Sequence, residues 1–201
     1  MAFPARLAIA SRNPHKLREL GRICADWPVE WVTVESHDPA PFPDVEETGT
    51  TYLENALLKA RAVAGALDVP AIADDSGIEA DALGGKPGPR SARFAGEGAS
   101  DDDNLRALLA AVKGVPGGGR AARYRCIAAI AYPDGREAHV EGVCEGVLRS
   151  KAAGGGGFGY DPIFEPVGWD VTMAELTDEE KDRISHRGRA FRGLREVLAA
   201  G

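Results

Sequence analysis

Short apolar runs alternate with stretches of helical periodicity in the first half of the chain, and this order constrains the fold more than any other feature. Apolar strands are predicted at residues 7–10, 29–34 and 71–73. Between them, apolar side chains recur every three or four residues from Leu17 to Cys24 and over residues 51–67, which is the period of an α-helix. Strands that alternate with helices predict an α/β fold.

The second half carries a β-hairpin signal. Pro133, Asp134 and Gly135 separate two strand-like segments, residues 121–132 and 136–148. An antiparallel hairpin added to alternating strands and helices predicts a mixed sheet.

Capping residues mark the starts of three predicted helices. Asn13 precedes Pro14 at the first helix, Ser100 precedes a helix over residues 101–112, and Thr177 forms a capping box with Glu180. A final helix is predicted over residues 189–199. The segments rich in proline, glycine or charge, residues 35–49 and 84–98, are predicted loops.

Composition indicates a folded globular protein and excludes several functions. The 201 residues suffice for one domain spanning residues 1–201, and 44% of them are hydrophobic. A net charge of −7 disfavours a nucleic-acid duplex as partner. Three cysteines without paired spacing are expected to be reduced, buried thiols. We find no signal peptide and no apolar run near the ~20 residues that span a bilayer, so we expect a cytoplasmic protein with no membrane partner.

A polar loop enters the first predicted helix and could hold a phosphate. It consists of Ser11, Arg12, Asn13, Pro14, His15 and Lys16. Free N–H groups and the helix dipole favour an anion there, and Lys16 adds a positive charge. The alternative is an ordinary turn capped by Asn13.

Acidic residues gather in two places and could bind a divalent metal. Asp44, Glu46 and Glu47 lie in a predicted loop, whereas Asp74 and Asp75 follow the third apolar run. Mg²⁺ takes one or two carboxylates together with water and substrate phosphates. The alternative is a set of solvated loop acids.

Two later segments could recognise a nucleoside. Phe158, Gly159, Tyr160 and Asp161 follow four glycines, and aromatic rings beside a flexible backbone can wall a base. Lys181, His186 and Arg187 could present donors near a helix end. The alternatives are a hydrophobic turn that packs on the core and a solvated helix end.

Together, these segments resemble the family of inosine/xanthosine triphosphate pyrophosphatases. The resemblance spans about residues 7–199 and is carried by Ser11–Lys16, Glu46–Gly49, Tyr52–Ala56, Ala73–Gly77, Leu83–Arg93, Gly156–Pro162 and Ile184–Gly188. It implies an elongated mixed sheet with helices in two lobes, a central active-site cleft and a homodimer. It also implies hydrolysis of ITP, dITP and XTP to the monophosphate and pyrophosphate.

The resemblance further implies a role for each matching residue. Ser11 through Lys16 would hold the triphosphate, and Ser76 would contact substrate. Glu46 and Asp75 would bind Mg²⁺, and Asp75 would accept the proton from the attacking water. The base and ribose would be lined by Phe158, Gly159, Tyr160, Asp161, Lys181, His186 and Arg187. Two alternatives stay open: a pyrophosphatase for other nucleotides, and a nucleotide-binding regulatory module without turnover.

Overall fold

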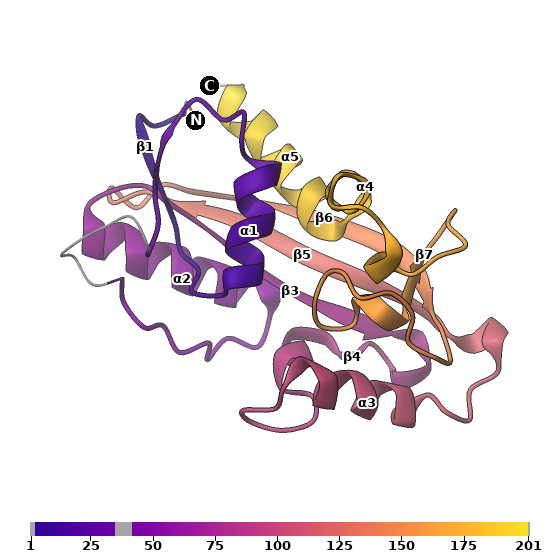
Figure 1. The fold of residues 1–201 in the computed structure, drawn as a ribbon. Coiled ribbons are helices and arrows are strands. Elements are labelled where there is room, and N and C mark those ends of the chain that lie inside the picture. The colour runs from indigo at the N-terminus through magenta and orange to yellow at the C-terminus, as the bar shows by residue number, and fades with distance from the viewer. Residues whose placement is uncertain (1–2, 35–41, 201) are drawn as a thin grey trace. The chain divides into compact units, whose positions relative to one another are not determined.

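The computed structural model describes residues 3–34 and 42–200, whose strands form one seven-stranded mixed sheet (Figure 1). The strands are β1 Arg6–Ile9, β2 Glu30–Val32, β3 Ala71–Ala80, β4 Lys86–Pro87, β5 Ala121–Ala131, β6 Glu137–Leu148 and β7 Phe164–Pro166. Their order is β2-β1-β3-β5-β6-β7, and β4 pairs with β3. β1 runs parallel to β2 and β3, while β7 runs antiparallel to β6. The predicted α/β fold with a mixed sheet is confirmed.

Five α-helices and five short 3₁₀ turns connect the described strands. The helices are α1 Pro14–Ile23, α2 Tyr52–Leu67, α3 Asp101–Ala111, α4 Asp178–Ile184 and α5 His186–Ala199. The 3₁₀ turns are η1 Asp81–Leu83, η2 Gly88–Arg93, η3 Gly117–Gly119, η4 Asp161–Ile163 and η5 Met173–Glu175.

Three helix starts follow the predicted capping chemistry. Asn13 Oδ1 accepts from the N–H groups of His15 at 2.9 Å and Lys16 at 3.3 Å. The capping boxes at Ser100 and Thr177 are both present. The prediction that the last helix begins at residue 189 is wrong, because only Ser185, in an extended conformation, separates α4 from α5.

The predicted hairpin is found, whereas the predicted loop over residues 84–98 contains β4 and η2. β5 and β6 are neighbours joined by a tight turn, in which Tyr132 N–H donates to the Arg136 carbonyl at 2.9 Å. The predicted loop over residues 35–49 lies partly outside the described residues; its described part, residues 42–49, contains no helix or strand.

The chain divides into two compact units. Unit 1 comprises the described residues within Met1–Asp75, Cys126–Gly142 and Arg187–Gly201. Unit 2 comprises Ser76–Arg125 and Val143–His186. Each unit has its own hydrophobic core, and the expectation of one domain over residues 1–201 stays a prediction.

Helices cover both faces of the sheet in unit 1. Leu7 and Ile9 of β1 pack with Leu20 of α1 and Phe191 of α5. The alternate residue Ala8 packs in a second cluster with α2. Because successive side chains of a strand point to opposite faces, α1 and α5 lie on one face and α2 on the other (Figure 1). The central strands are therefore buried on both sides.

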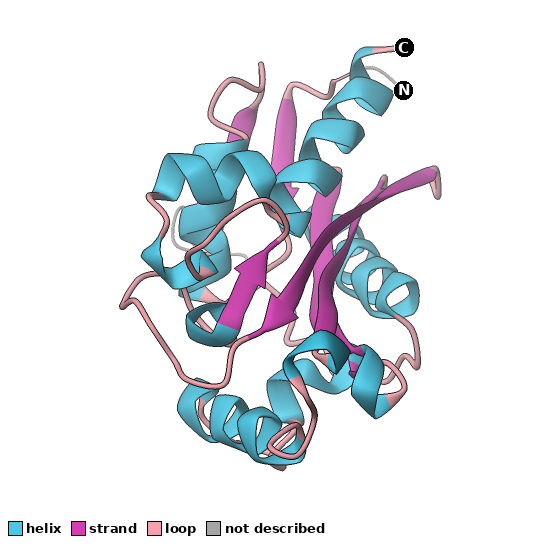
Figure 2. Ribbon diagram, turned by 90° about the vertical axis from the view of Figure 1, so that its right-hand side faces the viewer, coloured by secondary structure: helices cyan, strands magenta, loops and turns pink. Residues whose placement is uncertain are grey.

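Unit 2 contains residues 76–80 of β3, 121–125 of β5 and 143–148 of β6. The twist of these long strands is visible in Figure 2. Its core joins Ile78 of β3, Leu108 of α3, Cys144 of β6 and Phe164 of β7.

All three cysteines are buried free thiols, as predicted. Among the described residues, no helix is both long enough and apolar enough to cross a membrane.

Candidate active site

Two adjacent aspartates lie in the middle of β3. The sequence predicted that the strand ends at residue 73, but β3 continues to Ala80. Asp74 and Asp75 therefore point to opposite faces of the strand. Their exposed fractions are only 2% and 4%, so the interpretation as solvated loop acids is wrong for this pair. Buried carboxylates need charged or hydrogen-bonding partners, and each aspartate has its own set.

Asp74 is held by cations from both ends of the chain. Its Oδ2 accepts from Arg187 Nη2 at 3.0 Å and lies 3.1 Å from Lys16 Nζ. Arg187 also donates through Nη1 to Glu19 Oε2 at 2.5 Å. Burial alone would raise the pKa of Asp74, but Arg187, Lys16 and Lys59 together hold that pKa well below its usual range. Asp74 is therefore ionised at neutral pH.

The surroundings of Arg187 show a role that the sequence did not predict. Its side chain is 1% exposed, and its guanidinium donates to Asp74 and Glu19 within unit 1. Burial lowers the pKa of Arg187, but the charges of Asp74 and Glu19 raise that pKa by more than burial lowers it. The guanidinium therefore stays charged. Arg187 thus fixes Asp74 in place, while contact with the base stays a prediction.

Asp75 lies beside a lysine and an asparagine from α2. Asn55 Nδ2 donates to Asp75 Oδ2 at 3.2 Å, and Lys59 Nζ lies 3.8 Å from Asp75 Oδ1. Residues four apart share a helix face, which brings Asn55 and Lys59 to the same carboxylate. Burial raises the pKa of Asp75, and Lys59 and Lys16 oppose that effect without cancelling it.

The loop before α2 delivers a second carboxylate to the same lysine. Glu47 Oε1 lies 2.5 Å from Lys59 Nζ. Gly49 N–H donates to Asn55 Oδ1 at 2.8 Å, and a Cβ at position 49 would lie 2.6 Å from that oxygen. Only glycine allows this close approach, so Gly49 anchors the loop that carries Glu47.

The two carboxylates beside Lys59 are the candidate ligands for a magnesium ion. Glu47 and Asp75 present hard carboxylate oxygens at one lysine ammonium. Within residues 3–34 and 42–200, no group of three or more His, Cys, Asp or Glu side chains could hold a metal by itself. Mg²⁺ commonly uses one or two carboxylates and completes its shell with water and phosphates, so its binding at Glu47 and Asp75 stays a prediction. Glu46, the residue expected from the resemblance, is exposed, and its role stays a prediction.

Of the six residues in the predicted phosphate loop, Lys16 is the one whose described contacts reach the β3 aspartates. Lys16 reaches Asp74, both at the carboxylate and, at 3.4 Å, at the main-chain carbonyl. Arg12 instead donates to the Phe42 carbonyl, and His15 Nδ1 lies 2.8 Å from an Arg18 nitrogen. Ser11, Asn13 and Pro14 shape the turn into α1, where the Ser11 hydroxyl accepts from Asn13 N–H at 3.2 Å. Phosphate binding by this loop stays a prediction.

In unit 2, a buried ion pair organises the glycine-rich loop. Lys181 Nζ lies 2.5 Å from Asp161 Oδ2, and the same oxygen accepts from Phe158 N–H at 2.9 Å. Lys181 Nζ also lies 5.1 Å from the centre of the Phe158 ring. At Gly157, φ is +68°, and a Cβ there would meet Asp161 Oδ2 at 2.1 Å. Phe158, Asp161 and Lys181 thus form one assembly, and their contact with the base or ribose stays a prediction.

The remaining predicted residues of unit 2, apart from His186, do not contact the Asp161–Lys181 pair in the contacts described and are held by other parts of this unit. Tyr160 is a core residue whose hydroxyl donates to the Ser91 carbonyl at 2.7 Å. Gly159 N–H donates to Asp101 Oδ2 at 2.9 Å, which ties the loop to the start of α3. Ser76 is half-buried on β3.

His186 is held by an aromatic stack that the sequence did not reveal. Its ring is parallel to that of Tyr124, with centroids 4.5 Å apart and an interplanar angle of 7°. Tyr124 is itself packed edge-on against Phe164. A strand residue 62 positions earlier in the chain gives no local signal for this contact. The central cleft expected from the resemblance stays a prediction.

Comparisons with known proteins agree over nearly the whole chain. The sequence model of the Ham1 family matches residues 7–197. A dITP/XTP pyrophosphatase of Streptomyces coelicolor is 51% identical over 193 residues, covering 96% of each chain. A protein of the same name from Nocardia farcinica is 48% identical and covers 98% of this chain and 96% of its own.

Solved structures show the same fold. A HAM1 protein from Coxiella burnetii superposes with a TM-score of 0.87 at 36% identity, covering 98% of this chain and all of its own. The Ham1 protein of Staphylococcus aureus gives a TM-score of 0.84 at 39% identity, covering 97% of this chain and 98% of its own. The family model over residues 7–197 and relatives as similar as 51% show that this chain belongs to the Ham1 family.

Proposed function

We propose that this protein hydrolyses non-standard purine nucleoside triphosphates, namely ITP, dITP and XTP, to the monophosphate and pyrophosphate. The names of its relatives support the substrate class. The observation that carries the chemistry is Asp75, a buried carboxylate with a raised pKa that Lys59 holds beside Glu47. Such hydrolysis removes these nucleotides from the pool before they enter DNA or RNA.

Asp75 is the group that accepts the proton from the attacking water. A general base works best when its pKa approaches the working pH, and burial moves the pKa of Asp75 in that direction. Asn55 Nδ2 holds one carboxylate oxygen and so fixes the orientation of the other. Asp74, whose pKa is lowered, keeps its negative charge and fixes Lys16 instead.

Lys16 and Lys59 supply positive charge for the triphosphate. Hydrolysis between the α- and β-phosphates leaves pyrophosphate, and nearby cations stabilise that leaving charge. Mg²⁺, held by Asp75 with Glu47 or Glu46, would add charge neutralisation at the phosphates. The two lysines already lie at Asp74 and Asp75, so they are in position before substrate binds.

Base selection is assigned to donors in unit 2. A 6-oxo purine accepts hydrogen bonds where adenine presents an amino group. A buried donor that meets the amino group is left unpaired, and this penalty discriminates strongly. Lys181 and His186 are buried groups with donor capacity, and Phe158 beside Lys181 offers an aromatic surface for the base.

Hydrolysis of ITP in ¹⁸O-labelled water tests the proposed reaction. Attack at the α-phosphorus places the label in the inosine monophosphate and leaves the pyrophosphate unlabelled, as mass spectrometry of the two products would show. Label in pyrophosphate, or release of single phosphates, would place the attack elsewhere. ITP that binds without any hydrolysis would instead support the regulatory module.

The pH dependence of kcat/KM reports on Asp75. Because Asp75 must be ionised to act as a base and its pKa is raised from 3.8, we expect activity to rise with pH along an acid limb above pH 3.8. Lys59 lowers the pKa of Asp75, so Lys59→Met should move this limb to higher pH. A limb that stays in place in the variant would show that Asp75 is not the titrating group.

Tyr124→Leu is expected to weaken selection of the base. Loss of the aromatic stack frees the His186 ring, and a contact of this kind contributes roughly 0.5–1.5 kcal/mol. The ratio of kcat/KM for ITP to that for ATP should therefore fall about two- to tenfold. Tyr124→Phe keeps the ring and serves as the control. An unchanged ratio in Tyr124→Leu would remove the stack from the account of selectivity.

Two further expectations belong to this proposal. The buried free thiols Cys24, Cys126 and Cys144 are typical of a reducing compartment, which supports a cytoplasmic location. A homodimer is expected from the resemblance alone, and light scattering would measure the mass directly.

A further inference from the structure

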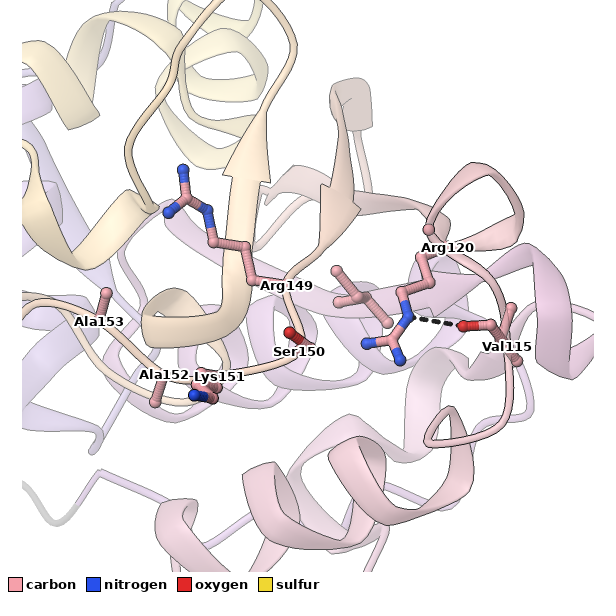
Figure 3. Close-up of a pocket in the computed structure, with 9 residues that line it drawn as sticks. Val115, Arg120, Arg149, Ser150, Lys151, Ala152 and Ala153 are labelled. Carbon is pink, nitrogen blue, oxygen red and sulfur yellow. Dashed lines mark hydrogen bonds between the residues drawn. The ribbon is translucent and has the colours of Figure 1, made fainter.

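Unit 2 contains a pocket of ≈490 Å³ that includes none of the residues assigned above (Figure 3). One side is formed by Val115, Gly117 and Arg120, which follow α3. The other is formed by the end of β6 at Leu148 and by the next five residues, up to Ala153. Its size falls within the range of small-molecule sites, which is about 300–1,000 Å³.

The lining of this pocket is basic, although the whole chain carries a net charge of −7. Arg120, Arg149 and Lys151 line it, and the lining residues, all in the described part of the chain, include no Asp or Glu. Arg149 donates to Glu165 at 2.5 Å and to the Asp170 carbonyl, so a nearby acid already balances its charge. In Figure 3 its side chain extends away from that of Arg120. The positive charge of the pocket therefore comes from Arg120 and Lys151.

Arg120 is oriented before any ligand arrives. Its Nε donates to the Val115 carbonyl at 2.9 Å, which fixes the guanidinium plane and directs the Nη atoms elsewhere. Arg120 is half-buried, and the lining also includes the Ser150 hydroxyl and the exposed Lys151 ammonium (Figure 3). A fixed arginine fork, a second cation and a hydroxyl together suit a phosphate group.

We propose that this pocket binds a phosphate-bearing small molecule at a site separate from the catalytic carboxylates. The phosphate contacts Arg120, Ser150 and Lys151. The volume exceeds what a phosphate alone fills, and Val115 and Leu148 provide apolar walls for the rest of the ligand. The phosphate could come from a nucleotide or from the free inorganic ion, and the experiment below separates these sources.

Amide chemical shifts of the full-length ¹⁵N-labelled protein test this site without relying on turnover. Inorganic phosphate and inosine monophosphate are titrated separately in EDTA at constant ionic strength, with inosine as the uncharged control. We expect saturable shifts at residues 117–119 and 150–152 with at least one phosphate compound and none with inosine. Tighter binding of the monophosphate would identify a nucleotide as the ligand, and equal binding would identify the phosphate group alone.

Charge variants show whether the pocket itself binds. Arg120→Gln and Lys151→Gln should each weaken binding about tenfold, as expected for loss of one charge-assisted hydrogen bond. Arg106→Gln removes the same charge from an exposed site on α3 and should leave binding unchanged. Lys151 is exposed, so its substitution tests the proposal even if Arg120→Gln disturbs the loop. Absence of saturable shifts, or equal binding by both charge variants and the wild type, would overturn the proposal. Neither result bears on hydrolysis.

Discussion

Asp75→Asn is expected to lower kcat for ITP about 10²- to 10⁴-fold, the usual contribution of a general base. The amide keeps the shape of the carboxylate but cannot take a proton from water. The pKa of Asp75 is raised, which means that burial already disfavours its charged form. A neutral side chain should therefore be tolerated, and the melting temperature should not fall.

Steady-state kinetics and thermal unfolding of the same preparations check this prediction. Asp102→Asn is a matched control, because Asp102 is exposed on α3 and its ion pair with Arg106 lies on the surface. We expect the control to retain wild-type activity. If Asp75→Asn kept a kcat within a few-fold of wild type while remaining folded, the proton would have to go to another group.

Arg187→Ala is expected to destabilise the protein by about 3–5 kcal/mol, because it leaves two buried carboxylates without their shared cation. Asp74 and Glu19 both accept from Arg187, and all three side chains are at least nine-tenths buried. Arg187→Lys should recover only part of this loss, since a single ammonium cannot reproduce the two-sided donation of a guanidinium. Urea unfolding followed by circular dichroism gives the free energies.

The pH dependence of this destabilisation has a defined sign. A lowered pKa at Asp74 means that the carboxylate stabilises the fold above its ordinary pKa of 3.8, and that this contribution is lost as the pH falls. The difference between wild type and Arg187→Ala should therefore be largest near neutral pH and shrink in acid. Arg189→Ala, at an exposed position on the same helix, should stay close to wild type at every pH. A difference independent of pH would indicate lost packing rather than an unpaired carboxylate.

Local patterns predicted much of the architecture. Hydrophobic periodicity located β1, α1 and α2, and the turn residues located the β5–β6 hairpin. Side-chain caps located the starts of α1, α3 and α4, because a cap depends on residues only three positions apart. The resemblance named Phe158, Asp161 and Lys181 together, but the ion pair between Asp161 and Lys181 depends on the tertiary fold and was not predicted.

Other features could not be predicted because they depend on partners distant in the sequence. The continuation of β3 through Asp74 and Asp75 goes against the low strand propensity of aspartate, and it is stabilised by Lys16, Lys59 and Arg187. Arg187 and Glu19 lie 168 positions apart, so no local pattern pairs them. Lys59 could have been found from its spacing of four residues from Asn55 on one helix face.

Pyrophosphate release from ITP, XTP, GTP and ATP, measured with Mg²⁺ and again with EDTA, tests the central claim most directly. The account predicts rapid release from ITP and XTP, slow release from GTP and ATP, and loss of all release in EDTA. Equal release from ATP and ITP would contradict the assignment of base selection to Lys181 and His186. Absence of pyrophosphate under every condition would contradict the enzyme itself.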